Sequence, residues 1–160
     1  DALAQAFAAM GFKNVRTLLA SGNVLFEAPA GSREKLAGKI SGKLAGTFGH
    51  EMHTILRTMP ELRRLADAQP FGGIKVTPRT RLFVTFLPDR PRSTLKIPYT
   101  SPDGSFCILC RSGRELCSVL TLGPQWAKNL RQMDILEKEF GKRVTTRSWN
   151  TVVRILRAGS

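Results

Sequence analysis

Two short landmarks recur at matched spacing along this chain of 160 residues, and this spacing restricts its fold more than any other feature. A Ser-Gly pair stands at Ser21-Gly22 and at Ser112-Gly113, and a Phe-Gly pair stands at Phe48-Gly49 and at Phe140-Gly141. The intervals from Ser to Phe are 27 and 28 residues. Matched spacing of this kind indicates an internal duplication. We therefore expect two halves built on one plan.

The first half has the pattern of a helix, a hairpin, a second helix and a strand. Asp1 can cap a helix that Gly11 ends, and the hairpin turn at Gly22 needs the positive φ that glycine allows. A capping box, Thr58 with Glu61, begins a further helix. The expected elements are a helix to Met10, strands at 14–20 and 24–28, a helix from Ser32 to Gly49 and a strand at 51–58.

The second half repeats this order and adds a last helix. Its expected elements are strands at 81–87, 106–111 and 115–122, a helix from Gln125 to Phe140, a strand at 143–147 and a helix from Ser148. A strand–helix–hairpin–helix–strand unit is the split βαβ, or ferredoxin-like, arrangement. The unit is complete if the Pro- and Arg-rich stretch 88–103 holds a short helix, whereas the first half lacks its opening strand.

The sequence therefore predicts an α+β protein of two ferredoxin-like halves with antiparallel sheets and a C-terminal helix. The first half spans 1–73 and the second spans 74–160, with the boundary near Gly73. The chain has no initiator Met and opens directly on a helix. A truncated start would account for the missing strand.

The composition is typical of a soluble globular protein, with 42% hydrophobic and 23% charged residues. No apolar run approaches the roughly 20 residues that span a bilayer, and the start lacks the basic and apolar segments of a signal peptide. The three cysteines are odd in number and clustered. They favour reduced thiols over a disulfide framework, so we expect a cytoplasmic protein with no membrane partner.

The net charge of +13 is the strongest compositional signal, and it is unevenly distributed. Residues 1–74 contain nine basic and six acidic residues, whereas 75–114 contain eight and two, and 126–160 contain eight and three. The excess in the second half would attract nucleic acid, acidic membrane or anionic ligands. The alternative is an arginine-biased coding background that leaves a basic, soluble surface.

Motifs for catalysis or metal binding are weak. Cys107 and Cys110 have the spacing of a redox or zinc pair, but an odd offset in a strand predicts side chains on opposite faces. No second Cys pair or nearby His completes a ligand set, so we expect no metal. Cys110 and Cys117 are expected directly opposite each other across a hairpin, as buried thiols. No Walker loop, nucleophile elbow or kinase set occurs, so the sequence assigns no enzymatic activity and no cofactor.

The stretch Val144–Leu156 brings hydroxyls, an arginine, an amide and a tryptophan together before an apolar run. Ser148 is a good N-cap for the last helix, with Trp149 at its first position. Capping does not require Arg147, Asn150 or Thr151. A helix N-terminus offers free N–H groups and a partial positive charge, and an adjacent Arg makes it suitable for an anion. The stretch is therefore either a helix start alone or a helix start that also binds an anion.

The candidate anion- or ligand-binding residues come from two segments. One is this helix start, and the other is the Ser-Gly-Asn turn, which the duplicated plan could place at a comparable end of the first half. The residues are Ser21, Gly22, Asn23, Thr146, Arg147, Ser148, Trp149, Asn150 and Thr151.

Two blocks, Gly11–Ala28 and Leu136–Leu156, resemble the bacterial family known as domain of unknown function 1697. Its members carry a Val-Arg-Thr, Ser-Gly-Asn, Val-x-Phe block and a late Thr-Thr-Arg-Asn-Trp-Asn-Thr block at similar separation. Ser148 stands where the family pattern has Asn. Members usually begin with a strand and an Arg-Gly-Ile-Asn-Val-Gly-Gly segment, which is absent here. The resemblance implies two similar ferredoxin-like halves and no established activity.

The leading functional hypothesis is non-catalytic binding of an anionic partner, with nucleic acid as the first candidate. The few aromatic residues argue against strong readout of single strands by base stacking. One alternative is an enzyme or binder that acts on a small phosphorylated or carboxylated molecule at the Arg147–Asn150 helix start. Another is a protein-assembly module whose basic surface meets an acidic protein. The sequence leaves the oligomeric state open.

Overall fold

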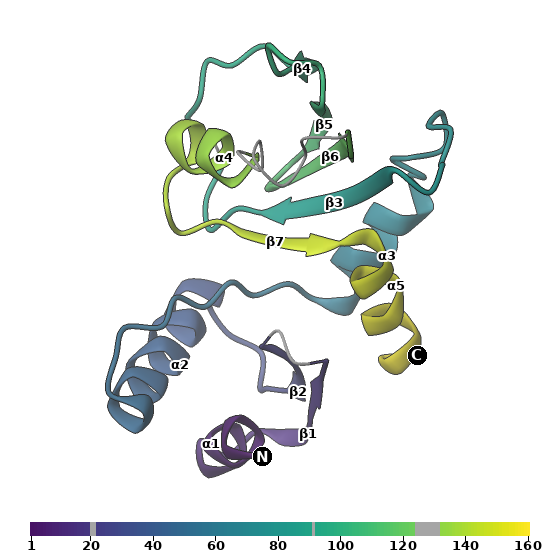
Figure 1. Cartoon of the computed structure of the whole chain (residues 1–160). Coiled ribbons are helices and arrows are strands. Elements are labelled where there is room, and N and C mark those ends of the chain that lie inside the picture. The colour runs from purple at the N-terminus through teal and green to yellow at the C-terminus, as the bar shows by residue number, and fades with distance from the viewer. Residues whose placement is uncertain (20–21, 91, 124–131) are drawn as a thin grey trace. The chain divides into compact units, whose positions relative to one another are not determined.

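The computed structural model describes residues 1–19, 22–90, 92–123 and 132–160. They form a mixed α+β protein of two compact units, Asp1–Leu56 with Gly159–Ser160 and Arg57–Ala158 (Figure 1). Each unit has a hydrophobic core of its own. The second unit begins at Arg57 and includes the helix that follows Thr58. The boundary predicted near Gly73 lies after this helix and stays a prediction.

The first unit combines two helices with a β-hairpin. Its elements are α1 (Ala2–Ala9), β1 (Lys13–Leu18), β2 (Asn23–Glu27) and α2 (Arg33–Phe48), and the two strands are antiparallel. Asp1 caps α1, as predicted, by accepting a hydrogen bond from the Leu3 N–H at 3.0 Å. The buried core contains Phe7, Phe12 and residues of α2. The ring of Phe26 on β2 packs against that of Phe12, with centroids 4.7 Å apart. The Phe26 ring also packs against that of Phe7 on α1, with centroids 5.1 Å apart, and this contact joins the hairpin to the helix.

Residues 51–58 form no strand, so the prediction of one is wrong. A strand needs a hydrogen-bonded neighbour. In the described part of the first unit, β1 and β2 pair only with each other. The apolar side chains of the segment are partly buried by packing instead, because Met52 and Leu56 lie against the core of the first unit.

The second unit is a five-stranded antiparallel sheet with three described helices, and α5 is the predicted C-terminal helix. The strand order is β4-β5-β6-β3-β7. Its elements are α3 (Met59–Asp67), β3 (Thr80–Phe86), β4 (Tyr99–Thr100), β5 (Phe106–Ser112), β6 (Glu115–Thr121), α4 (Gln132–Phe140), β7 (Thr145–Ser148) and α5 (Trp149–Ala158).

The helix considered for residues 88–103 is absent from the described residues 88–90 and 92–103, which instead contain the short strand β4. Prolines such as Pro88, Pro98 and Pro102 explain this, because each lacks an N–H donor and disfavours helical backbone in the residue before it. The order β5-β6-β3-β7 is compatible with a split βαβ unit, but the missing helix leaves the ferredoxin-like halves unconfirmed. The helix start predicted at Gln125 lies outside the described residues.

The sheet of the second unit has two faces with different neighbours. Leu116 and Leu120 of β6 lie on one face, where they form the core with Leu136 of α4. Because side chains alternate along a strand, Cys117 and the opposing Val84 lie on the other face. Both are buried, and α5 contacts β3 and α3 (Figure 1). These faces are referred to below as the α4 face and the Cys117 face.

The paired landmarks occupy similar positions in the two units. Gly22 and Gly113 lie in hairpin turns with φ of 75° and 59°. Gly49 and Gly141 follow α2 and α4 with φ of 76° and 93°, and each donates its N–H to a carbonyl of the last helical turn. Glycine adopts these angles at little cost. The duplication itself stays a prediction.

Candidate anion-binding site

The predicted helix start lies where an edge strand runs directly into a helix. β7 pairs with β3, with Ser148 opposite Phe83, and α5 begins at Trp149. The Oγ of Ser148 accepts a hydrogen bond from the Thr151 N–H at 3.1 Å and lies 2.9 Å from the Thr151 Oγ1. The predicted N-cap is therefore confirmed.

Two other side chains of this stretch are held by contacts within the unit. The Oγ1 atoms of Thr146 and Thr85 form a cross-strand hydrogen bond of 2.8 Å. The ring of Trp149 meets that of Phe71 edge-on, with centroids 5.2 Å apart. This geometry makes the tryptophan a packing anchor between α5 and the segment after α3.

Arg147 and Asn150 are the residues of the helix start that capping does not explain. Asn150 is exposed. Arg147 is half-buried and lies opposite Val84, on the Cys117 face, and its Nη1 donates to the Thr146 carbonyl at 3.0 Å. Burial lowers the pKa of the Arg147 guanidinium, because a partly desolvated cation loses hydration. Such a cation attracts an anion more strongly than a fully hydrated one does.

The other predicted segment, Ser21–Asn23, belongs to the first unit. The Nδ2 of Asn23 donates to the Leu18 carbonyl across the hairpin at 3.2 Å, and Gly22 makes the turn with its positive φ. Ser21 lies outside the described residues. The described residues Gly22 and Asn23 therefore stabilise the turn. This segment and the helix start remain two separate candidate sites for an anion.

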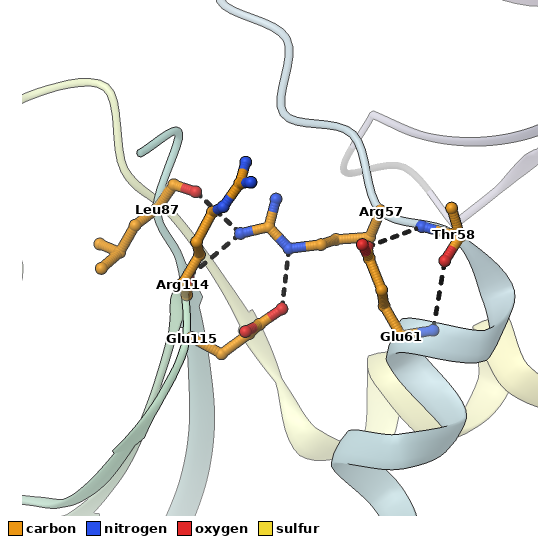
Figure 2. A network of polar contacts seen from close by, with 6 residues as sticks. All are labelled: Arg57, Thr58, Glu61, Leu87, Arg114 and Glu115. Carbon is orange, nitrogen blue, oxygen red and sulfur yellow. Dashed lines mark hydrogen bonds and ion pairs between the residues drawn. The ribbon is translucent and has the colours of Figure 1, made fainter. Parts of the chain in front are cut away.

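A polar cluster that the sequence did not indicate lies at the opposite end of the β3 pairing from the helix start (Figure 2). The Nε of Arg57 donates to the Glu115 Oε1 at 2.8 Å. The Nη2 of Arg57 donates to the carbonyl oxygens of Leu87, at 2.8 Å, and Arg114, at 3.1 Å. The side chains of Arg57 and Glu115 are only 7% and 14% exposed. The cluster is thus a largely buried, charge-assisted network.

This network joins three segments of the second unit: the start of α3, the end of β3 and the β5–β6 turn. Arg57 directly precedes Thr58, whose capping box with Glu61 is present as predicted. The guanidinium carbon of Arg57 also lies 5.6 Å from the centroid of the Phe86 ring. The sequence signal for this network is weak. Glu115 is an isolated acid in a basic region, and its partner lies 58 residues earlier.

The three cysteines share the Cys117 face, so the prediction that Cys107 and Cys110 face opposite sides is wrong. Cys107 lies opposite Val119, and Cys110 lies opposite Cys117, as predicted for this second pair. A register shift between Ile108 and Cys110 inserts an extra residue into β5, and this bulge reverses the alternation. Within the residues that the structure describes, no group of three or more potential ligands is placed to hold a metal ion.

A family model described as "Protein of unknown function (DUF1697)" matches residues 1–99. The chain belongs to this family. The match covers Asp1–Leu56 of the first unit, including the Gly11–Ala28 block, and extends through β3 of the second unit. The late block, Leu136–Leu156, lies outside the matched residues, so the helix start is not part of the matched region.

No curated protein and no solved structure matches this DUF1697 member. Among its described residues, no helix combines the length and the apolar character needed to cross a membrane.

Replacing Ser148 with Ala should lower the free energy of unfolding by about 1 kcal/mol, because the Thr151 N–H loses its cap. Urea denaturation of the full chain measures this change. Asn150→Ala, at an exposed position of the same helical turn, is the matched control and should be nearly neutral. Equal stability of the wild type and Ser148→Ala would contradict the capping role.

If the helix start binds an anion, phosphate or sulfate should raise the melting temperature of the wild type, because a ligand that binds only the folded state stabilises it. The gain is about 2.7 kcal/mol at a hundredfold excess over the dissociation constant. Arg147→Ala and Asn150→Ala should lose this response, whereas Arg154→Ala, an exposed cation later in α5, should keep it. Equal responses from all four proteins would leave the stretch as a helix start only.

Replacing Arg57 with Met should lower the free energy of unfolding by about 3–5 kcal/mol, because Glu115 would keep a buried charge without its partner. Urea denaturation provides the measurement, and Arg63→Met, an exposed cation on α3, provides the control with an expected change within about 0.5 kcal/mol. The double variant Arg57→Met/Glu115→Leu should recover part of the loss. A loss for Arg57→Met no larger than that for Arg63→Met would show that the network does not stabilise the unit.

Proposed function

We propose that this protein binds an anionic partner without catalysis, and that the partner is the phosphate backbone of a nucleic acid. One observation carries the proposal: the positive charge is concentrated in one unit. Residues 57–158 contain nineteen basic and eight acidic residues, a net charge of +11, whereas the first unit contains six and four. A field concentrated in this way attracts polyanions.

The excess charge is at the surface of the second unit. Among its described residues, fourteen exposed Lys and Arg side chains compare with four exposed carboxylates, Asp67, Asp89, Asp103 and Asp134. Internal ion pairs therefore cannot neutralise most of this surface. The exposed cations are Arg63, Arg64, Lys75, Arg79, Arg81, Arg90, Arg92, Lys96, Arg111, Lys138, Lys142, Arg143, Arg154 and Arg157.

The strand register gathers part of this charge at one end of the sheet. Phe86, at the end of β3, lies opposite both Glu115, after the β5–β6 turn, and Thr145, at the start of β7. The cations that flank these three points therefore lie near one another, whereas Glu115 is paired with Arg57. Arg90, Arg111, Arg114, Lys142 and Arg143 are referred to below as the cationic end.

A pocket of about 740 Å³ adjoins the cationic end, and its lining includes Arg90 and Arg92. The same lining contains the carboxylates Asp89 and Glu139, and Ser93 holds Glu139 by a hydrogen bond of 3.0 Å. These carboxylates would repel a small anion inside the pocket. The mixed lining therefore disfavours a free phosphate bound inside the pocket. It favours a polyanion that lies along the exposed cations outside the pocket.

A second candidate function is the binding of a small phosphorylated or carboxylated molecule at the start of α5. The half-burial of Arg147, next to the exposed Asn150 and the positive end of a helix, favours it. Against it, the Ser148 hydroxyl already occupies the Thr151 N–H. The anion melting experiment described above separates this candidate from polyanion binding.

We also propose that the two halves of the chain, residues 1–73 and 74–160, derive from one ferredoxin-like plan. Glycine at matching hairpin turns and helix ends supports this idea, as does the strand order of the second unit. The basic charge would then be a property that one copy acquired, since the other copy is nearly neutral.

A labelled DNA duplex or single-stranded RNA should bind the full chain, with an affinity that falls steeply between about 50 and 200 mM salt. Fluorescence anisotropy gives the dissociation constant at each salt concentration. The triple variant Arg111→Gln/Lys142→Gln/Arg143→Gln should bind more weakly, and its log–log salt slope should be smaller by roughly one unit for each phosphate that no longer meets a cation.

The matched control removes the same charge elsewhere, through Lys75→Gln/Arg154→Gln/Arg157→Gln, and should change the slope little. Equal losses from both triple variants would contradict a role for the cationic end. Undetectable binding of both nucleic acids at low salt would contradict nucleic-acid binding itself.

A further inference from the structure

Two thiols face each other across the β5–β6 hairpin with very different access to solvent. Cys110 is partly exposed, whereas the opposing Cys117 is 1% exposed. We propose that the two form a dithiol–disulfide exchange site, in which Cys110 reacts with a low-molecular-weight disulfide and Cys117 then closes an internal disulfide. This inference does not depend on anion binding.

The hairpin register meets the distance requirement for such a bond. Directly opposite residues in an antiparallel pair have Cα atoms roughly 4.5–5.5 Å apart. Disulfides form at Cα separations of about 4.4–6.8 Å. Because Cys110 and Cys117 are direct partners, their side chains also lie on the same face of the sheet. The bond can therefore form without separation of the strands.

The surroundings of the two thiols set the order of the steps. Burial raises the pKa of the Cys117 thiol above its usual range, and the neighbouring Cys110 and Glu115 raise it further. Arg57 and Arg147 also lie on this face, but neither is placed to stabilise a Cys117 thiolate. Arg57 is bound to Glu115, and Arg147 lies on the far side of β3. Cys117 is thus a poor first nucleophile, and the more accessible Cys110 is the thiol that meets an external disulfide.

The chemistry balances with glutathione disulfide as the oxidant. The Cys110 thiolate attacks one sulfur of glutathione disulfide, which forms a mixed disulfide and releases one glutathione. The Cys117 sulfur then attacks the Cys110 sulfur and releases the second glutathione, which takes up the Cys117 proton. Two protein thiols are oxidised to one disulfide, and one glutathione disulfide is reduced to two glutathione molecules.

The internal disulfide would close a ring of eight residues, from Cys110 to Cys117. The entropic stabilisation from a cross-link grows with the length of the chain that it closes, so a short ring gains little. This small gain suits a bond that forms and breaks by exchange more than a permanent structural link. Its effect would be to join β5 to β6 beside the bulge.

The chain contains its own control thiol, because Cys107 is partly exposed on the same face of β5 and lies opposite Val119. The test treats the folded Cys107→Ser protein with glutathione disulfide, quenches in acid and measures the intact mass. The expected product is two hydrogens lighter, carries no glutathione, returns to the starting mass with dithiothreitol and yields a Cys110–Cys117 linked peptide.

Two further proteins test the order of the steps. Cys107→Ser/Cys117→Ser should accumulate one glutathione on Cys110. If the buried serine disturbs folding, Cys107→Ser/Cys117→Ala replaces this variant and should give the same adduct. Cys107→Ser/Cys110→Ser should remain unmodified while folded. A stable glutathione adduct on Cys110 in the Cys107→Ser protein, or no reaction there at all, would overturn the proposal.

Discussion

The second unit depends on a buried ion pair, Arg57–Glu115, that joins segments remote from one another in the chain. The guanidinium reaches the Glu115 carboxylate and two backbone carbonyls, so it satisfies acceptors from the end of β3 and from the β5–β6 turn together (Figure 2). Removing such a cation leaves several polar groups buried without a partner, which costs far more than the net gain from forming the pair. The position of the hairpin is therefore coupled to the start of α3.

Part of the exposed positive charge flanks the same end of the sheet. The network uses one arginine for the fold, whereas Arg90, Arg111, Lys142 and Arg143 of the cationic end are exposed. Neutralising Glu115 inside the unit removes a carboxylate that would otherwise oppose an approaching polyanion. A fold contact and a proposed binding surface thus reinforce each other without sharing side chains. The buried pair holds the β5–β6 turn, and Arg111, near the end of β5, is exposed to solvent.

Much of the local structure could be predicted from sequence, because caps and turns depend on residues a few positions apart. The Ser148 cap, the Thr58–Glu61 capping box and the opposition of Cys110 and Cys117 are of this kind. The strand expected at 51–58 failed for the opposite reason. Apolar residues such as Met52 and Leu56 indicate burial, but a strand also requires a pairing partner, which the local sequence does not contain.

The sequence by itself determined the membership of the DUF1697 family, the α+β class, helix ends such as the Ser148 cap and Gly49, and the concentration of charge in the second half. The tertiary structure alone decided that Arg57 meets Glu115 and that Cys107 shares a face with Cys110. The first outcome depends on a contact across 58 residues, and the second depends on one extra residue in β5 that reverses the side-chain alternation. Neither leaves a periodic signal in the sequence, because both arise from how strands register against their neighbours.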